Sequence, residues 1–355
     1  MRLGLVLNPS KGGWERVLDA VTAHVRQSGW PEPAVHLTSR EETGRSQAAA
    51  AVAAGAELVV VAGGDGTVRE VAHGLARTGV ELGIVPVGTA NLLAHNLGLP
   101  RTVPAAVQVA VAGRPRQVDL GLARVDDSGD LPFVVLAGMG HDAATVAATN
   151  PTLKDRIGWP AYVAPAAVSA LRRPVPVTVR HDRGDPEHLR VWSVLAANCT
   201  RVRAGVHIAP GGLVDDGLFD VLEVTVRRPG QWLGVAAKGV FRLPGDVPGL
   251  ATRASREVEV VSEAPLHVPL DGDVLFALDG DTVLESPDYI ERCVRELYQG
   301  AGIASACGQL RTLGGAAARA TARADTPVTF VASGLGDPAQ VAVGAAARCT
   351  ARPAV

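Results

Sequence analysis

The sequence is poor in aromatic residues and in cysteine, and each shortage excludes a class of function. Phe, Trp and Tyr make up 4% of the 355 residues, too few for the stacking platforms that bind single-stranded nucleic acid. The formal net charge of −2 gives no basic footprint for nucleic acid either. The four cysteines form no C-x-x-C pair. Cysteine spacing therefore suggests neither a zinc site nor a disulfide framework, and it favours a reducing cytosol.

Long apolar runs are also missing. No stretch of about 18 consecutive apolar residues occurs, so we expect no transmembrane helix. The N-terminus has one Arg and a short apolar run that ends at Asn8 and Pro9, which is not typical of a signal peptide. These features favour a cytoplasmic protein that is able to visit a membrane surface.

What is present is enough apolar sequence for one large or two ordinary domains, with 47% hydrophobic and 20% charged residues. Over residues 1–118, apolar strand-like runs alternate with segments of helical spacing. This alternation predicts a three-layer α/β nucleotide-binding domain with a parallel sheet. The predicted strands are 3–7, 34–38, 57–64 and 82–87, and the predicted helices are 14–29, 41–56, 67–79 and 102–115.

The pattern changes after residue 118. Over 119–273 short strand-like segments separated by turns predict a second, β-rich sandwich domain with interposed helices at 159–173 and 231–243. Residues 274–355 form an atypical tail, which is biased towards Ala, Gly and Arg after about residue 313, and we assign that last part no fold.

The stretch "VVVAGGDGTVREV", residues 59–71, is the most informative motif. Two glycines after a buried strand let a ligand approach the main chain, and the start of the following helix offers free N–H groups to an anion. No lysine follows as a Walker A loop requires, and no G-x-G-x-x-G is present. A tight turn with a solvent-facing Asp65 is the purely structural alternative.

Four motifs in order resemble the diacylglycerol kinase catalytic-domain family, in particular its soluble bacterial lipid kinases. They are "LVLNPSKGG", "GGDGTVREV" with "GTANLLAHNLGLP", "LVDDGLFDV" and "LDGD". The resemblance covers about residues 1–275. It implies an ATP-dependent kinase that phosphorylates diacylglycerol or a related lipid alcohol, with Mg²⁺, a lipid substrate, transient membrane-surface contact and no nucleic-acid partner. A homodimer is an open alternative.

Residue by residue, the resemblance implies that ATP is held by loops after the first four strands. The matching positions are Asn8, Pro9, Ser10, Lys11, Gly12, Thr38, Gly64, Asp65, Gly66, Thr67, Val68, Arg69, Glu70, Thr89 and Asn91. Read without the family, Lys11 is a surface lysine, Thr38 caps a strand end and Asn91 starts a helix.

The resemblance also implies a magnesium site at Leu213, Asp216 and Leu218, where one carboxylate and main-chain carbonyls supply the oxygen ligands that Mg²⁺ prefers. The structural alternative is an Asp-Asp-Gly hairpin turn. The family ends its active site in Asp-Gly-Glu, whose Glu is the catalytic base. This chain has Asp271-Gly272-Asp273. We assign the base to Asp273, with Asp271 able to share the role.

Residues 274–312 resemble a fragment of a family-2 glycosyltransferase, because "ALDGD" places Asp279 and Asp281 as a D-x-D motif. We interpret the tail as an inactive remnant that displaces the final strand of the kinase. Three alternatives to a lipid kinase stay open: an NAD kinase-like enzyme that shares the glycine turn, a catalytically impaired nucleotide- or lipid-binding homologue, and a glycosyltransferase acting through the tail.

Overall fold

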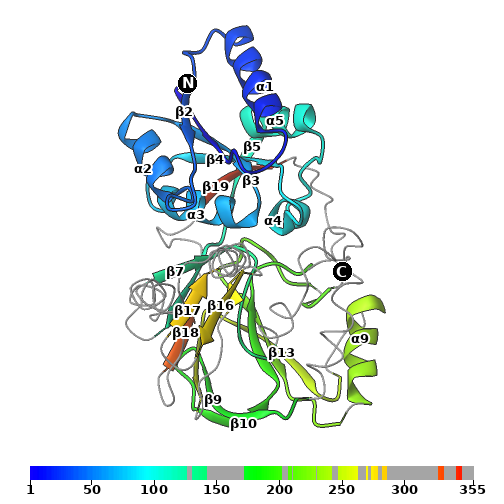
Figure 1. Cartoon of the computed structure of the whole chain (residues 1–355). Coiled ribbons are helices and arrows are strands. Elements are labelled where there is room, and N and C mark those ends of the chain that lie inside the picture. The colour runs from blue at the N-terminus through cyan, green and yellow to red at the C-terminus, as the bar shows by residue number, and fades with distance from the viewer. Residues whose placement is uncertain are drawn as a thin grey trace, which may run out of the picture. The chain divides into compact units, whose positions relative to one another are not determined.

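The computed structural model divides the chain into two compact units (Figure 1). The first unit comprises residues 1–120, residues 214–216 and the described residues after 332, and the second comprises the rest. No helix in the described part of the chain is long and apolar enough to cross a membrane. The structure describes residues 1–125, 130–141, 172–201, 207–209, 211–228, 230–241, 247–262, 269–270, 273–278, 282–285, 327–331 and 341–345.

The first unit is built on a six-stranded sheet with the order β2-β1-β3-β4-β19-β5. Strands β2, β1, β3, β4 and β19 run parallel, and β5 is antiparallel to β19. This confirms the predicted α/β class. The elements are β1 (Leu3–Leu7), α1 (Trp14–Gln27), β2 (Ala34–Leu37), α2 (Arg45–Ala53), β3 (Leu58–Gly63), α3 (Asp65–Leu75), β4 (Glu81–Pro86), α4 (Leu92–Asn96), α5 (Val103–Ala112), β5 (Arg114–Val118) and β19 (Val341–Ala345).

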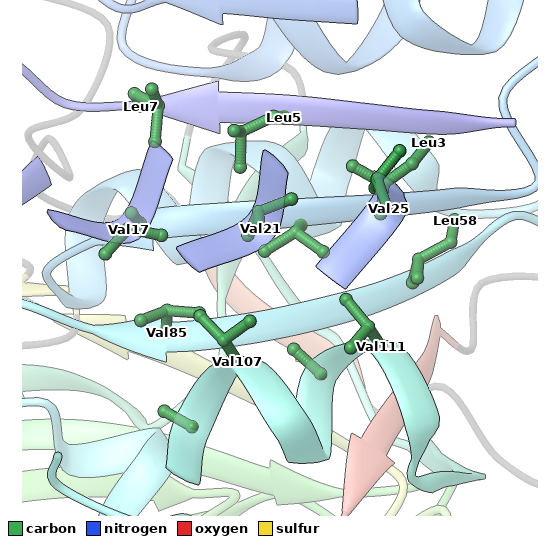
Figure 2. Packing of buried hydrophobic residues seen from close by; sticks show 14 residues of the cluster. Leu3, Leu5, Leu7, Val17, Val21, Val25, Leu58, Val85, Val107 and Val111 are labelled. Atoms are coloured by element: carbon green, nitrogen blue, oxygen red, sulfur yellow. The ribbon is translucent and has the colours of Figure 1, made fainter. Parts of the chain in front are cut away.

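Helices cover both faces of this sheet, because its central strands are apolar on both sides. On one face, α1 and α5 pack on Leu3, Leu5 and Leu7 through a core that includes Val21 and Val107 (Figure 2). The opposite face meets α2 so closely that a Cβ at Gly4 would lie 2.7 Å from the Cβ of Ala51.

The second unit contains two further sheets, which confirms the predicted β-rich domain. Their strand orders are β10-β9-β14-β18-β6-β7 and β13-β12-β11-β8-β15-β16-β17. Phe133 and Phe219, with ring centroids 5.1 Å apart, belong to one shared core. The elements are β6 (Gly121–Val125), β7 (Asp130–Phe133), β8 (Leu136–Gly140), β9 (Val175–His181), β10 (Glu187–Val191), β11 (Ser193–Ala197), β12 (Phe219–Val224), α9 (Gln231–Phe241), β13 (Leu250–Ser255), β14 (Glu257–Ser262), β15 (Pro269–Leu270), β16 (Asp273–Leu278), β17 (Thr282–Glu285) and β18 (Pro327–Val331).

A polar cluster links the two sheets of this unit. His181 at the end of β9 contacts Glu223 Oε1 through Nε2 at 2.7 Å and Ser255 Oγ through Nδ1 at 2.8 Å. Glu223 and Ser255 belong to β12 and β13 of the other sheet and are almost fully buried. Since buried polar groups are stable only when they are hydrogen-bonded, this cluster fixes the position of one sheet on the other.

The tail differs from the sequence-based expectation, which gave no fold to its last part. Strand β18 lies between β14 and β6 in one sheet, and β19 lies between β4 and β5 in another. The short apolar runs "PVTFV" and "VAVGA" fit strands, but each was too short to predict alone. The predicted helix at 159–173 lies almost entirely outside the described residues.

Candidate active site

The loops predicted to hold ATP follow the carboxyl ends of neighbouring parallel strands in the first unit. Main-chain hydrogen bonds join these strand ends: Asn8 N to Ala62 O at 3.0 Å, Thr38 N to Leu7 O at 2.9 Å and Val87 N to Gly63 O at 3.2 Å. Open α/β sheets place ligands at this edge. The structure therefore brings the predicted loops to one place.

Two glycines pack main chain against main chain at the centre of this edge. A Cβ at Gly88 would lie 2.4 Å from the Cα of Gly64 and 2.7 Å from Asn91 Oδ1. No side chain fits there without moving the backbone. Gly88 was not among the predicted nucleotide residues, although it is the first residue of the G-T-x-N motif, which was the available signal.

Helix α3 begins directly at the glycine turn. Gly64 is its N-cap residue and supplies no side-chain hydrogen bond, and the first intrahelical bond runs from Val68 N to Gly64 O at 3.0 Å. The N–H groups of a first helical turn have no intrahelical acceptors. The N-terminus of α3 is therefore suited to receive an anion through main-chain amides.

Asp65 connects this turn to the next loop. Its Oδ1 accepts a hydrogen bond from the N–H of Leu93 in α4 at 3.2 Å. The purely structural alternative for Asp65 was a carboxylate facing water. Instead the side chain is half-buried and holds the start of α4 beside the start of α3.

Asn8 organises the opposite side of the turn. Its Nδ2 donates to Thr67 Oγ1 at 2.9 Å, and its Oδ1 accepts from the N–H of Ser10 at 3.0 Å and from the Ser10 hydroxyl at 2.6 Å. Thr67 is only 7% exposed. The hydroxyl of Thr67 is therefore oriented by Asn8 rather than capping α3.

Asn91 shapes the fourth loop, and its own backbone has the left-handed conformation, with φ of 47°. Its side chain closes on Gly88 from both sides: Oδ1 accepts from Gly88 N at 3.0 Å and Nδ2 donates to Gly88 O at 2.6 Å. Asn tolerates this conformation better than most residues. Asn91 thus fixes the loop that carries the exposed Thr89.

The remaining predicted nucleotide residues have varied environments. Thr38 and Val68 are buried, and Arg69 forms an ion pair with Glu70 at 3.3 Å. Lys11 and Asn8 are half-buried on the first loop, whereas Pro9, Ser10 and Gly12 are exposed. Arg69 and Glu70, paired with each other within α3, are less suited to grip a ligand than the turn amides are.

The predicted magnesium residues lie in one turn. Val214–Asp216 belong to the first unit, where Val214 O accepts from Asp119 N at 2.8 Å, whereas Leu213 and Leu218 belong to the second. Asp216 is half-buried. No group of three or more His, Cys, Asp or Glu side chains gathers anywhere among the described residues. Any cation here would need main-chain oxygens in addition to Asp216.

The predicted base begins a strand: Asp273 is the first residue of β16, paired with Leu270 of β15. Asp271 lies outside the described residues, as do Asp279 and Asp281 of the glycosyltransferase-like motif. The assignment of Asp273 as the base stays a prediction.

The glycine turn and the following loops match a known family. A model of the diacylglycerol kinase catalytic domain matches residues 2–123, and a model of the YegS C-terminal NAD kinase beta sandwich-like domain matches residues 134–289. A protein of Chromohalobacter salexigens named "Probable lipid kinase YegS-like" is 33% identical over 277 residues, which cover 77% of this chain and 86% of that protein. The chain belongs to the diacylglycerol kinase catalytic-domain family.

Two further proteins are similar to this chain in sequence or in fold. An uncharacterized protein of Synechocystis sp. is 28% identical over 292 residues, which cover 76% of this chain but only 65% of that protein. The crystal structure of a diacylglycerol kinase from Bacillus anthracis superposes with a TM-score of 0.58 at 19% identity, and the match covers 81% of this chain and 91% of that one. The sandwich-domain match extends to residue 289 and so includes residues 274–289, the first part of the segment that resembled a glycosyltransferase.

Proposed function

We propose that this kinase-family protein transfers the γ-phosphate of ATP to a hydroxyl group of diacylglycerol or a related lipid alcohol. The observation that carries the proposal is the main-chain contact of Gly64 with Gly88 beside the start of α3. With no side chain at either glycine, phosphates would lie directly against the backbone. The YegS-like lipid kinase names of the relatives support a lipid, rather than NAD, as the acceptor.

The nucleotide would be held mainly by main-chain amides and hydroxyl groups. Amides at the start of α3 face the phosphates with the positive end of the helix dipole, and the Asn8–Thr67 pair positions a hydroxyl beside them. A P-loop enzyme uses a lysine for this charge. Here Lys11 is the one lysine among the predicted nucleotide residues, and it is half-buried.

The turn at 213–218 fits magnesium by its donor chemistry, because Asp216 is half-buried and Leu213 and Leu218 could add carbonyl oxygens. Bound magnesium would neutralise charge on the transferred phosphoryl group. The residues of the chain would orient the phosphates and hold Asp216 in this turn.

Asp273 would accept the proton of the lipid hydroxyl. The hydroxyl oxygen then forms a bond to the γ-phosphorus, while the bond from that phosphorus to the β–γ bridging oxygen breaks and ADP leaves. Asp is one methylene shorter than the Glu that the family resemblance implies. A displacement of about 1 Å can lower a rate by roughly 10²-fold, so this position favours a second candidate, a catalytically impaired homologue.

The test is to incubate the full chain with Mg²⁺-ATP and either a panel of lipid alcohols or NAD, and to identify phosphorylated products by mass spectrometry. A phosphorylated lipid is the expected product. Phosphorylated NAD, or no product at all, would overturn the proposal. The Asp273→Glu variant is measured in parallel, and activity that appears only in this variant would identify the natural protein as the impaired homologue.

A further inference from the structure

Helix α9 carries an apolar residue outward where a surface helix normally carries charge. Trp232 and Val235 face inward: the Trp232 ring lies 4.9 Å from the Trp192 ring, and both residues pack on the cluster that contains Val226. Leu233 is 77% exposed, the highest exposed fraction among the large hydrophobic residues that the structure describes. The outer faces of surface helices are usually polar, yet the only ionisable residue of α9 is Lys238.

Basic residues flank this exposed apolar residue. Arg227 and Arg228 are both exposed. Their main-chain N–H groups donate to Gln231 Oε1 at 2.8 and 3.0 Å, which fixes their backbone against the first turn of α9. Among the described residues neither guanidinium has an ion-pair partner. Residues 226–246 contain four basic side chains and one acidic side chain, although the whole chain has a net charge of −2.

We infer that the first turn of α9 with Leu233, together with Arg227 and Arg228 just before the helix, is a docking surface for a bilayer that contains anionic lipids. Apolar insertion combined with nearby arginines is how interfacial helices bind membranes. The charge of the segment selects an anionic lipid surface over a neutral one. This inference rests on the proposed function, because an enzyme that acts on a membrane lipid must reach the bilayer.

The inner and outer residues of α9 have different roles in the proposed docking. Trp232 anchors the helix to the second unit, so that Leu233 can enter the lipid without disturbing the core. Gln231 also holds the main chain of Arg227 and Arg228 against the first turn of the helix. A preorganised surface of this kind binds with a smaller loss of conformational entropy.

The test measures co-flotation of the full chain with vesicles of phosphatidylcholine alone and of phosphatidylcholine mixed with phosphatidylglycerol, without ATP. We expect binding to the mixed vesicles only, and weaker binding at high salt. Leu233→Asp should reduce the partition coefficient by about 10-fold or more. Arg227→Gln and Arg228→Gln should each reduce it by roughly fivefold.

Matched controls change an exposed residue elsewhere. Val35→Asp replaces another exposed apolar side chain, on β2, and Arg183→Gln removes an exposed arginine after β9. Both should bind vesicles like the original chain, and thermal melting checks that every variant folds. Equal binding of neutral and mixed vesicles, no binding at all, or undiminished binding of Leu233→Asp would overturn the inference. Because no ATP is present, a failed kinase assay would not change these results.

Discussion

The carboxylate of Asp65 accepts a hydrogen bond from the main-chain N–H of Leu93, 28 residues further along the chain, at 3.2 Å. Asp65 is the first residue of α3, and Leu93 lies in the first turn of α4. One side chain therefore connects two of the loops that the family resemblance assigns to ATP. A structural role and a chemical role for Asp65 can be separated by substitution.

Asp65→Asn keeps an oxygen that can accept the Leu93 N–H, whereas Asp65→Ala removes it. We expect the free energy of unfolding to fall by about 1 kcal/mol in the Ala variant and by less than about 0.5 kcal/mol in the Asn variant. Urea denaturation measures both values. If the negative charge also serves phosphoryl transfer, both variants lose kinase activity. An Asn variant as unstable as the Ala variant would contradict the hydrogen-bond role.

Gly88→Ala places a methyl group where Gly64 Cα already lies 2.4 Å away. Neither backbone can move without displacing the glycine turn, so the free energy of unfolding should fall by about 1–3 kcal/mol. ATP affinity should fall as well, because the phosphate-facing amides move. Calorimetric titration with Mg²⁺-ATP and thermal melting measure the two effects. Gly230→Ala is the control, since its Cβ would meet nothing within 4 Å. A Gly88→Ala variant as stable and as tightly ATP-binding as this control would refute the close contact.

The stability of the second unit should depend on pH through His141. Burial is the main reason that the pKa of His141 lies below its ordinary value. The Arg172 cation lowers the pKa further, and a hydrogen bond to the Arg173 carbonyl partly opposes the shift. A histidine with a depressed pKa in the folded state binds fewer protons there than in the unfolded state, so stability rises with pH in this range. The contribution of His141 to stability is complete above about pH 6.5 and is lost as the pH falls through the pKa of the folded state.

Urea denaturation of the original chain and of His141→Gln between pH 5 and 8, roughly the range in which histidine titrates, measures this dependence. The original chain should lose stability below about pH 6.5, and the variant should lose less over the same interval. If both curves have the same slope, His141 is not responsible.

Strand β19 should be needed for the first unit. Within the described residues, β5 pairs with β19 and with no other strand. Truncation after Gln340 removes β19, and we expect the unfolding midpoint to fall by about 5 °C or more. Truncation after Ala345 keeps the strand and is the matched control. A midpoint unchanged in both truncations would support the interpretation of the tail as a remnant.

Much of the first unit could be predicted because its signals are local. The helical spacing of Val17, Val21 and Val25 predicts α1 from one short segment, and the apolar run before Gly63 predicts a buried parallel strand. The predicted helix after the glycine turn began at Thr67, whereas α3 begins at Asp65. Helix ends depend on caps, and Gly64 gives no side-chain signal for the boundary.

Features that depend on distant pairing could not be predicted. Strands β5 and β6 are separated by only a short step in the sequence, but they join sheets in different units. The split follows from separate partners, β19 and β18, more than 200 residues away in the sequence. The Gly64–Gly88 contact could not be predicted either, because no periodicity of the sequence relates the two glycines. The motif resemblance predicted which loops form the candidate site, and the structure shows how these loops contact one another.

The positions of β18 and β19 have a consequence for synthesis of the protein. The ribosome makes each of these strands long after the strands between which it lies. A nascent chain that has emerged only as far as β17 cannot yet close either sheet, and it exposes unpaired strand edges that favour aggregation. Both sheets can therefore be completed only once the C-terminal segment has left the exit tunnel.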